Sequence, residues 1–418
     1  MSNSVALTAP RAAAYGLMGL PLAFLALPLY VLLPNHYARE FGLPLATLGG
    51  LLLGARLFDA LVDPLLGRLS DRLFQRSVPG LLGVAALVCL FMAAGFALLF
   101  FPPVQSGPGL IAVSAVLLVL TYTCFSAVTL AHQSWGALLG SDALRQSRLL
   151  AWREGLGLVG VLLASVAPVL WGLDVMVALF WGLLAAGWLA WWKSPRPAVT
   201  EAGSGGHVWL PWQRRPFRRL LSVFVLNGIA SAVPATLVLF FVQDRLQADA
   251  AMEPLFLGGY FLSAALSTPL WLAAVRRLGL ARSWLTGMLL AVLVFVWAAA
   301  LGPGDGRYFL VVCALSGVAL GADLVMPGAM LAGVIARCGD LGRVQGTYYG
   351  WWNFATKLNL ALAAGLALPL LALAGYTPGA RDAQAQQALG VAYCLLPCVL
   401  KLGAAALLYQ FFLRKGES

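Results

Sequence analysis

Long apolar runs, each about as long as one bilayer crossing, restrict the fold of this chain more than any other feature. A helix needs about 20 apolar residues to cross the hydrocarbon core of a membrane. Six such runs are expected near 14–35, 44–67, 79–101, 109–135, 149–171 and 174–193, and six more near 218–243, 254–275, 281–302, 308–334, 346–375 and 387–412. The sequence therefore predicts an all-α membrane protein with about twelve transmembrane helices.

A polar stretch rich in chain-breaking residues separates the two sets of runs. We therefore expect an N-terminal six-helix bundle over 1–193, a cytoplasmic linker over 194–217 and a C-terminal six-helix bundle over 218–418. The halves also echo each other faintly, since Leu48-Gly49-Gly50 and Leu257-Gly258-Gly259 open the second span of each. Carriers built from such repeats hold their substrate in a central cavity and expose it to each side in turn.

The composition argues against a soluble protein, because only 10% of the residues are charged and 61% are hydrophobic. Soluble domains carry roughly a quarter charged residues. An enzyme within the membrane would need a nucleophile with its base or a cluster of metal ligands. The chain has three histidines and neither an HExxH nor a GxSxG motif. We predict a transporter that is not an enzyme and has no cofactor and no structural metal.

The Lys and Arg residues that give the formal net charge of +11 are distributed unevenly among the predicted loops, and this distribution indicates the topology. Twenty Lys and Arg residues fall in loops on one side of the predicted membrane and four on the other, while Arg56, Lys357 and Lys401 lie within spans. Positively charged loops stay cytoplasmic. We therefore expect both termini in the cytoplasm and no nucleic-acid binding. The preference for arginine and the lack of a targeting segment are typical of a bacterial inner (cytoplasmic) membrane protein.

A compact group of charged residues, Arg56, Asp59 and Asp63, interrupts the second span. A charge at the centre of a membrane helix costs about 2.5–3.5 kcal/mol even on lenient scales. Asp59 and Asp63 lie one turn apart on one helix face. Two neighbouring carboxylates repel, so the pair favours taking up a cation or a proton. The alternative is a structural network in which Arg56 neutralises the pair.

The motif Gly67-Arg-Leu-Ser-Asp71-Arg72 follows this span and resembles the GxxxDR loop of major facilitator carriers, where it latches a gate. The resemblance implies a gating role for Gly67, Asp71 and Arg72. The alternative is an ordinary cytoplasmic loop, which would explain the arginines but neither Gly67 nor Asp71.

Several motifs together resemble the glycoside-pentoside-hexuronide:cation symporter family of the major facilitator superfamily, which includes melibiose permease. They run through nearly the whole chain, as Tyr15-Gly16, Arg56-Leu-Phe-Asp59-Ala-Leu-Val-Asp63-Pro64, Tyr122-Thr123, Arg153 and Gly350-Trp-Trp-Asn353-Phe-Ala-Thr-Lys357. The resemblance implies a major facilitator fold and cation-coupled symport by alternating access.

Specific residues acquire expected roles from this resemblance. Asp59, Asp63 and Thr123 would line a sodium or proton site, and Lys357, with Arg56, would couple it to the other half. Arg153 would contact the substrate, although a local ion pair with Glu154 is the alternative. The remaining substrate-binding candidates are cavity residues with hydrogen-bonding or aromatic side chains: Tyr122, Ser126, Trp135 and Asn353. For Trp135, packing at the membrane interface is an equal alternative.

The departures from the family pattern concern the cargo and the ion. The family's two sugar-binding acids would fall at Pro21 and Ser126, and a polar residue of its cation site would fall at Val62. A disaccharide is therefore not supported, and sodium is less favoured than protons. We expect a small polar solute, sugar- or glycoside-like, or alternatively a lysophospholipid or another amphipathic solute.

Two further polar residues within spans have no family counterpart. Asp323 in the tenth span is a candidate substrate contact or proton carrier, and a helix-end carboxylate is the alternative. His132 in the fourth span is a packing residue or a proton relay. We expect the protein to function as a monomer in the lipid bilayer.

Overall fold

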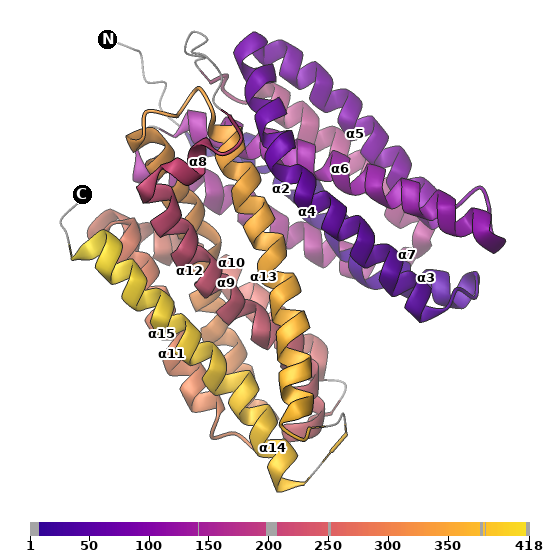
Figure 1. Ribbon diagram of the computed structural model, residues 1–418, viewed down its shortest axis with the longest axis vertical. Helices are drawn as coiled ribbons and strands as arrows, with labels where there is room; N and C mark the ends of the chain where they lie inside the picture. The colour runs from indigo at the N-terminus through magenta and orange to yellow at the C-terminus, as the bar shows by residue number, and fades with distance from the viewer. Residues whose placement is uncertain are drawn as a thin grey trace. The chain divides into compact units, whose positions relative to one another are not determined.

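The computed structural model describes residues 8–140, 142–197, 207–249, 252–376, 379–380 and 382–414, and all regular structure among them is helical (Figure 1). The chain forms two compact units, one made of Met1–Gln213 with Ile335–Phe354 and the other of Arg214–Val334 with Ala355–Ser418. The short stretch Ile335–Phe354 thus packs with the first unit, although it lies in the second half of the sequence.

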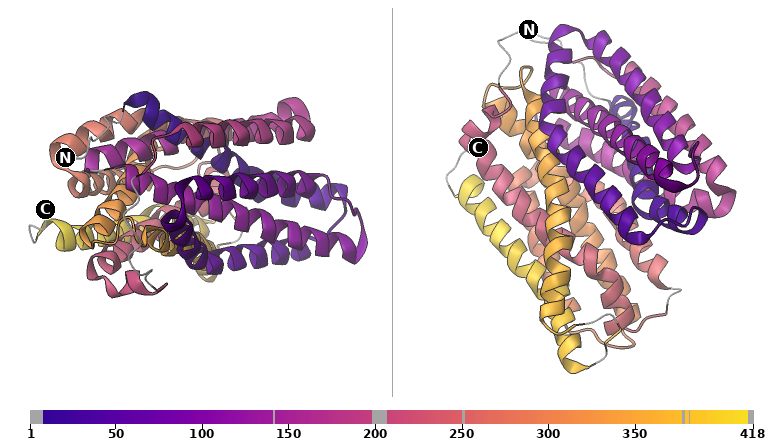
Figure 2. Two further views of the ribbon diagram at one scale, coloured as in Figure 1. Left: turned by 90° about the horizontal axis from the view of Figure 1, so that it is seen from above. Right: turned by 45° about the vertical axis from the view of Figure 1, so that its right-hand side comes forward.

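The helices of the first unit are α1 (Ala9–Gly16), α2 (Gly19–Leu27), a π-helical turn (Pro28–Leu32), α3 (Leu33–Glu40), α4 (Leu45–Arg76), α5 (Val78–Phe100), α6 (Gly107–Leu139), α7 (Ala143–Lys193) and α8 (Leu210–Gln213). In Figure 2, the indigo to magenta helices α4, α5 and α6 lie alongside one another. They pack around a core of large apolar side chains such as Phe96, Phe100 and Phe180.

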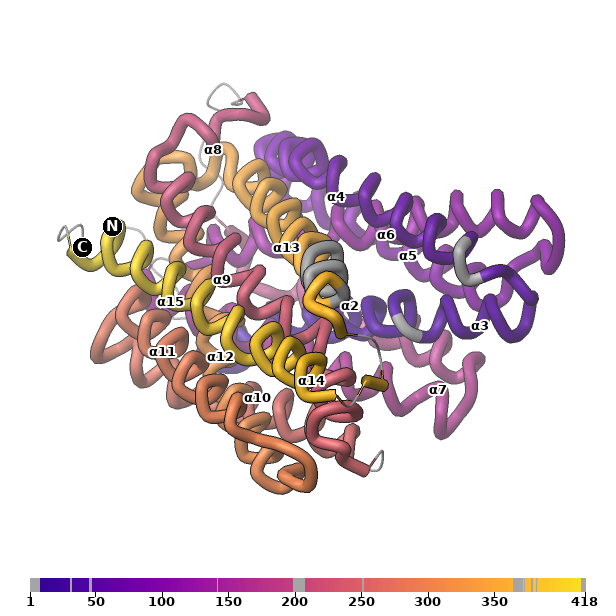
Figure 3. Tube along the Cα trace, turned by 60° about the horizontal axis from the view of Figure 1, so that its bottom comes forward, coloured from indigo at the N-terminus to yellow at the C-terminus, as the bar shows by residue number. Residues whose placement is uncertain are grey.

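The second unit contains α9 (Arg215–Phe240) with a π-helical turn (Phe241–Arg245), α10 (Glu253–Leu278), α11 (Leu280–Ala298), α14 (Ala383–Gly390), a π-helical turn (Val391–Leu395), α15 (Leu396–Leu408) and a final π-helical turn (Tyr409–Leu413). Helices α12 (Gly306–Arg337) and α13 (Gln345–Leu373) contribute to both units. Figure 3 shows α15 beside α9 and α11, in agreement with their packing contacts.

Each expected span coincides with a helix or with a consecutive series of helical segments. Among the described residues, nine helices are long and apolar enough to cross a membrane. One of these is the 51-residue α7, which covers the expected fifth and sixth spans. Gly172 divides α7 with φ 86° and ψ 173°, a conformation that glycine adopts without the steric cost of a side chain. The all-α architecture predicted from the sequence is confirmed.

The two faces of helix α4 carry different residues. Exposed leucines recur at every fourth position on one face: Leu53, Leu57, Leu61, Leu65 and Leu69. Asp59 and Asp63 are on the buried face, where they are 3% and 0% exposed. The 3.6-residue period of the helix therefore turns the carboxylates into the first unit and the leucines outwards.

Candidate functional site

The two acids predicted to bind the coupling ion are held inside the first unit by α4 and α6. The Ser126 hydroxyl on α6 donates a hydrogen bond to Oδ1 of Asp59 at 2.6 Å. Asp63 lies one turn further along α4 and is fully buried. Buried carboxylates are stable only when they are paired, hydrogen-bonded or protonated. The two acids can therefore take up a cation or a proton. Ser126 stabilises the Asp59 carboxylate through its hydrogen bond.

Arg56 packs on an aromatic pair next to these acids. Its guanidinium carbon lies 3.4 Å from the ring centroid of Tyr30, a cation–π contact. The Tyr30 ring stacks on Tyr122 with 6.1 Å between centroids. The π-helical turn Pro28–Leu32 carries Tyr30, so the irregular part of the first span supplies the ring beneath Arg56.

Thr123 follows Tyr122 on α6 and is the third predicted cation ligand. Its Oγ1 atom is buried and makes no hydrogen bond to another described residue. Lys357 is half-buried on α13 and belongs to the second unit. Its expected approach to Asp59 and Asp63 stays a prediction.

Three further substrate candidates, Trp135, Arg153 and Asn353, belong to the first unit. Trp135 is fully buried and donates from its indole nitrogen to the Pro195 carbonyl at 3.1 Å. Arg153 forms the local ion pair with Glu154, at 2.6 Å. Asn353 is half-buried near the start of α13. Their substrate contacts remain predictions.

His132 is packed against Tyr15 in the interior of the first unit. The two rings stack with 4.2 Å between centroids, and the Tyr15 hydroxyl donates to the His132 carbonyl at 3.1 Å. The Nε2 atom of His132 lies 2.9 Å from the Tyr15 carbonyl oxygen. These contacts match the packing alternative considered from the sequence.

The expected gating loop is helical, because Gly67, Asp71 and Arg72 lie within α4. Asp71 caps the beginning of α13. Its carboxylate accepts hydrogen bonds from the Gly346 amide at 2.6 Å, and from the amide and hydroxyl of Thr347 at 2.8 Å each. The glycines allow this approach, because a Cβ on Gly67 would collide with the Gly346 backbone. Arg72 is exposed beside this contact. Gly67 and Asp71 thus join the end of α4 to the start of α13.

Replacing Asp71 with alanine is expected to loosen this contact. Buried donors left without an acceptor cost about 1–3 kcal/mol each, so hydrogen exchange at the Gly346 and Thr347 amides should accelerate at least about tenfold. Amide hydrogen exchange with mass spectrometry measures this. Arg72→Ala changes the neighbouring exposed residue and should leave these two amides unaffected; equal exchange in both variants would contradict the role of Asp71.

The same contact should also respond to pH. Burial raises the pKa of Asp71 from its ordinary 3.8 to about 7, although its three donors act in the opposite direction. The Asp71 carboxyl therefore binds a proton more tightly when the contact with α13 is formed than when it is broken. The free energy that this proton binding adds to the contact is fully present below pH 3.8 and is lost as the pH rises towards 7. In this range the equilibrium constant for forming the contact falls by up to about tenfold per pH unit. Exchange protection of Gly346 should fall between pH 5 and pH 7, and Asp71→Ala should remove this dependence.

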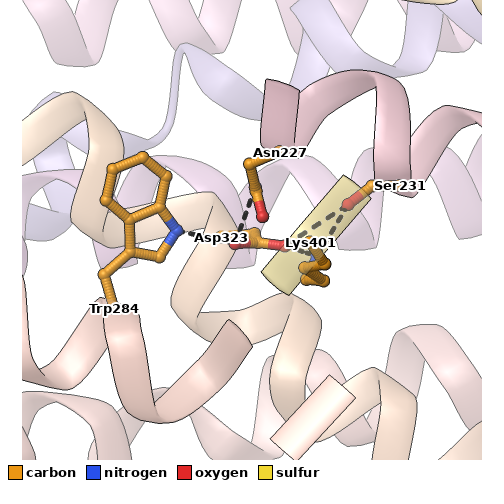
Figure 4. A network of polar contacts seen from close by, with 5 residues as sticks. All are labelled: Asn227, Ser231, Trp284, Asp323 and Lys401. Atoms are coloured by element: carbon orange, nitrogen blue, oxygen red, sulfur yellow. Dashed lines mark hydrogen bonds and ion pairs between the residues drawn. The ribbon is translucent and has the colours of Figure 1, made fainter. Parts of the chain in front are cut away.

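A buried ion pair lies in the second unit (Figure 4). The Lys401 ammonium on α15 is 2.8 Å from Oδ2 of Asp323 on α12, and both side chains are largely buried. The indole of Trp284 and the amide of Asn227 donate to Oδ1 of Asp323, at 2.8 and 3.1 Å. Ser231 accepts from Lys401 at 2.9 Å. Asp323 is therefore a fully partnered carboxylate in the interior of the unit.

The sequence predicts a role for Asp323 but for none of its partners. Lys401 could have been recognised as one of the few cations within a span, since such residues pair with buried acids. Trp284, Asn227 and Ser231 carry no comparable signal, because apolar spans commonly contain such residues.

Comparison with known families identifies the chain. The sequence profile of the family described as "MFS/sugar transport protein", where MFS is the major facilitator superfamily, matches residues 12–192 and 196–415. The chain belongs to this family. It is therefore a multi-pass membrane protein that transports a small-molecule substrate across a lipid bilayer, and it is a secondary transporter, not an enzyme.

Three relatives are similar in sequence to this transporter, one over about half of the chain and two over most of it. The mouse (Mus musculus) sphingosine-1-phosphate transporter MFSD2B is 29% identical over 47% of the chain, and the match spans only 40% of that protein. The glucuronide carrier protein homolog of Escherichia coli (strain K12) is 25% identical over 90% of the chain and 86% of its own length. The uncharacterized symporter YjmB of Bacillus subtilis (strain 168) is 22% identical over 88% and 83%.

The fold is also shared with a solved structure. A bacterial homologue of the iron transporter ferroportin, in an outward-facing state, superimposes with a TM-score of 0.74 at 15% identity, over 97% of this chain and 99% of that one. At this identity the likeness concerns the fold alone. It confirms the major facilitator architecture predicted from the sequence.

Proposed function

We propose that this transporter is a symporter that couples solute movement to protons or sodium ions. The observation that carries the proposal is the burial of Asp59 and Asp63 on one face of α4, with Ser126 donating to Asp59. A membrane protein keeps such costly acids where they bind an ion or relay a proton. The likeness to a named symporter and the resemblance to glycoside-pentoside-hexuronide:cation symporters support the same function.

The proposed cargo is a small polar solute, sugar- or glycoside-like. The near full-length similarity to a glucuronide carrier homolog supports it. Arg153, Tyr122 and Asn353 remain the proposed substrate contacts of the first unit. Lys357 and Arg56 are the proposed coupling residues, because a cation bound at the acids would compete with a basic partner and thereby favour one arrangement of the carrier.

An amphipathic cargo is the second candidate. Ser126 takes the place of one sugar-binding acid of the resembled family, and here its hydroxyl is engaged with Asp59. The partial similarity to a sphingosine-1-phosphate transporter also favours a lipid-like solute. We propose further that the protein is a monomer in a bacterial inner membrane, with both termini in the cytoplasm.

Proteoliposomes test the proposed function directly. Purified transporter is reconstituted in sealed vesicles, and sugars, glycosides and lysophospholipids are added while internal and external pH and sodium uptake are followed. A symporter moves protons or sodium only when its solute is present. Solute flux that is independent of both gradients would overturn ion coupling, and competition by lysophospholipids but not by sugars would select the amphipathic cargo.

A further inference from the structure

A cavity of about 260 Å³ lies within the second unit, between α9, α10, α11, α12, α15 and the π-helical turn that leads into α15. Its lining is mostly apolar and rich in aromatic side chains, including Phe256, Phe309 and Tyr393. Asp323 and Lys401 are the only charged residues among those that line it, within the described part of the chain. None of the candidates predicted for the ion site contributes to it.

The polar and aromatic residues of the lining are separated along the helices. Helix α12 supplies Phe309 and, 14 residues later, Asp323, a distance of about 20 Å at 1.5 Å per residue. Tyr393 precedes Lys401 by eight residues, about 12 Å. Phe309 lies 5.0 Å from Phe256 and 6.4 Å from Tyr393 between ring centroids. The cavity therefore has an aromatic end and a charged end, as an amphiphile requires.

The hydrogen bonds at the charged end leave a donor available. Asp323 accepts from Trp284, Asn227 and Lys401, and a longer contact from Ser231 at 3.5 Å completes its set. The Lys401 ammonium has three N–H groups, of which two point to Asp323 and Ser231. The third has no hydrogen-bond partner among the described residues. A ligand with an acceptor atom can satisfy it.

The charge balance of this end excludes an ionic ligand. Asp323 and Lys401 neutralise each other at 2.8 Å, so an added anion or cation would be an uncompensated charge in an apolar cavity. Burying such a charge costs several kcal/mol. An uncharged head with a hydrogen-bond acceptor adds a bond to Lys401 without this penalty.

We propose that this cavity binds an electrically neutral amphiphile, with its uncharged polar head at Lys401 and its hydrocarbon or aryl tail among Phe256, Phe309 and Tyr393. At about 10–15 Å³ per water-sized group, the cavity of about 260 Å³ holds roughly 20 non-hydrogen atoms. An eight-carbon alcohol is a short member of this class. The inference goes beyond the proposed function, because it concerns one unit and does not depend on ion coupling.

Photoaffinity labelling in phosphatidylcholine nanodiscs tests the proposal. The probe is an octanol that carries a diazirine on its chain, and mass spectrometry maps the labelled residues. We expect labelling of α10 and α12 near Phe256 and Phe309. With wild-type protein, octanol should compete at least tenfold more effectively than octanoate or octylammonium at equal concentrations in the membrane. Equal or better competition by either ion would overturn the proposal.

A pair of variants on one helix provides the structural control. Ala291 lines the cavity on α11, whereas Leu289 is 48% exposed on the same helix. Ala291→Phe should lower the labelling at least fivefold, and Leu289→Phe should leave it unchanged. Labelling that persists in Ala291→Phe would place the probe elsewhere and contradict the assignment. Because the readout is labelling and not flux, its failure is separate from a failure of ion coupling.

Discussion

Asp59→Asn and Asp63→Asn are each expected to reduce solute-driven ion movement strongly while leaving solute exchange across the membrane measurable. Asparagine keeps the shape of the side chain but neither binds a proton nor balances the charge of a cation. Coupling free energies of about 1–3 kcal/mol correspond to about 5- to 150-fold effects, so ion uptake per transported solute should fall by about 10- to 100-fold. Proton and sodium fluxes in proteoliposomes measure the ion, and solute counterflow measures exchange.

Ser126→Ala is the graded control for this pair. It removes the 2.6 Å hydrogen bond to Asp59 but keeps both carboxylates. A hydrogen bond to a charged group contributes about 1.5–3 kcal/mol, so the apparent ion affinity should change by about tenfold or more while coupling persists. Wild-type ion uptake in both Asp59→Asn and Asp63→Asn would remove their coupling role and leave them structural.

Local sequence patterns predict much of the fold. Each membrane helix must form its backbone hydrogen bonds within itself, so it corresponds to one continuous apolar run in the sequence. The expected boundary between spans near residue 172 coincides with Gly172, where a positive φ divides α7. The position of Asp59 and Asp63 on one helix face follows from helical periodicity alone.

Contacts between distant helices could not be predicted in the same way. Nothing in the spacing of α4 indicates that Ser126, 67 residues later, donates to Asp59, or that Asp71 caps the start of α13. Such pairings depend on which helices pack together and on their rotation. Trp135 illustrates the limit, because an aromatic residue within a span fits both a cavity and the core in which the structure places it.

Lys401→Met is expected to destabilise the second unit strongly, because it leaves the Asp323 carboxylate buried without its cation. Removing one partner of a buried ion pair costs about 3–5 kcal/mol. The remaining donors, Trp284, Asn227 and the more distant Ser231, provide hydrogen bonds but no compensating charge. Denaturation by sodium dodecyl sulfate in mixed micelles, followed by tryptophan fluorescence, measures the free energy of unfolding. Arg276→Met removes an exposed cation and should change it by less than about 0.5 kcal/mol.

The double variant Asp323→Leu with Lys401→Met separates the pair from its members. Apolar replacement of both partners of a buried ion pair is often neutral or stabilising, so the double variant should recover most of the stability lost in Lys401→Met. The double-mutant cycle should then give an interaction free energy of up to about 3 kcal/mol. Additive losses would mean that Asp323 and Lys401 act independently. A double variant that recovers stability and yet loses the preference for octanol over octanoate and octylammonium would assign the buried pair to ligand recognition, because folding would not require the pair.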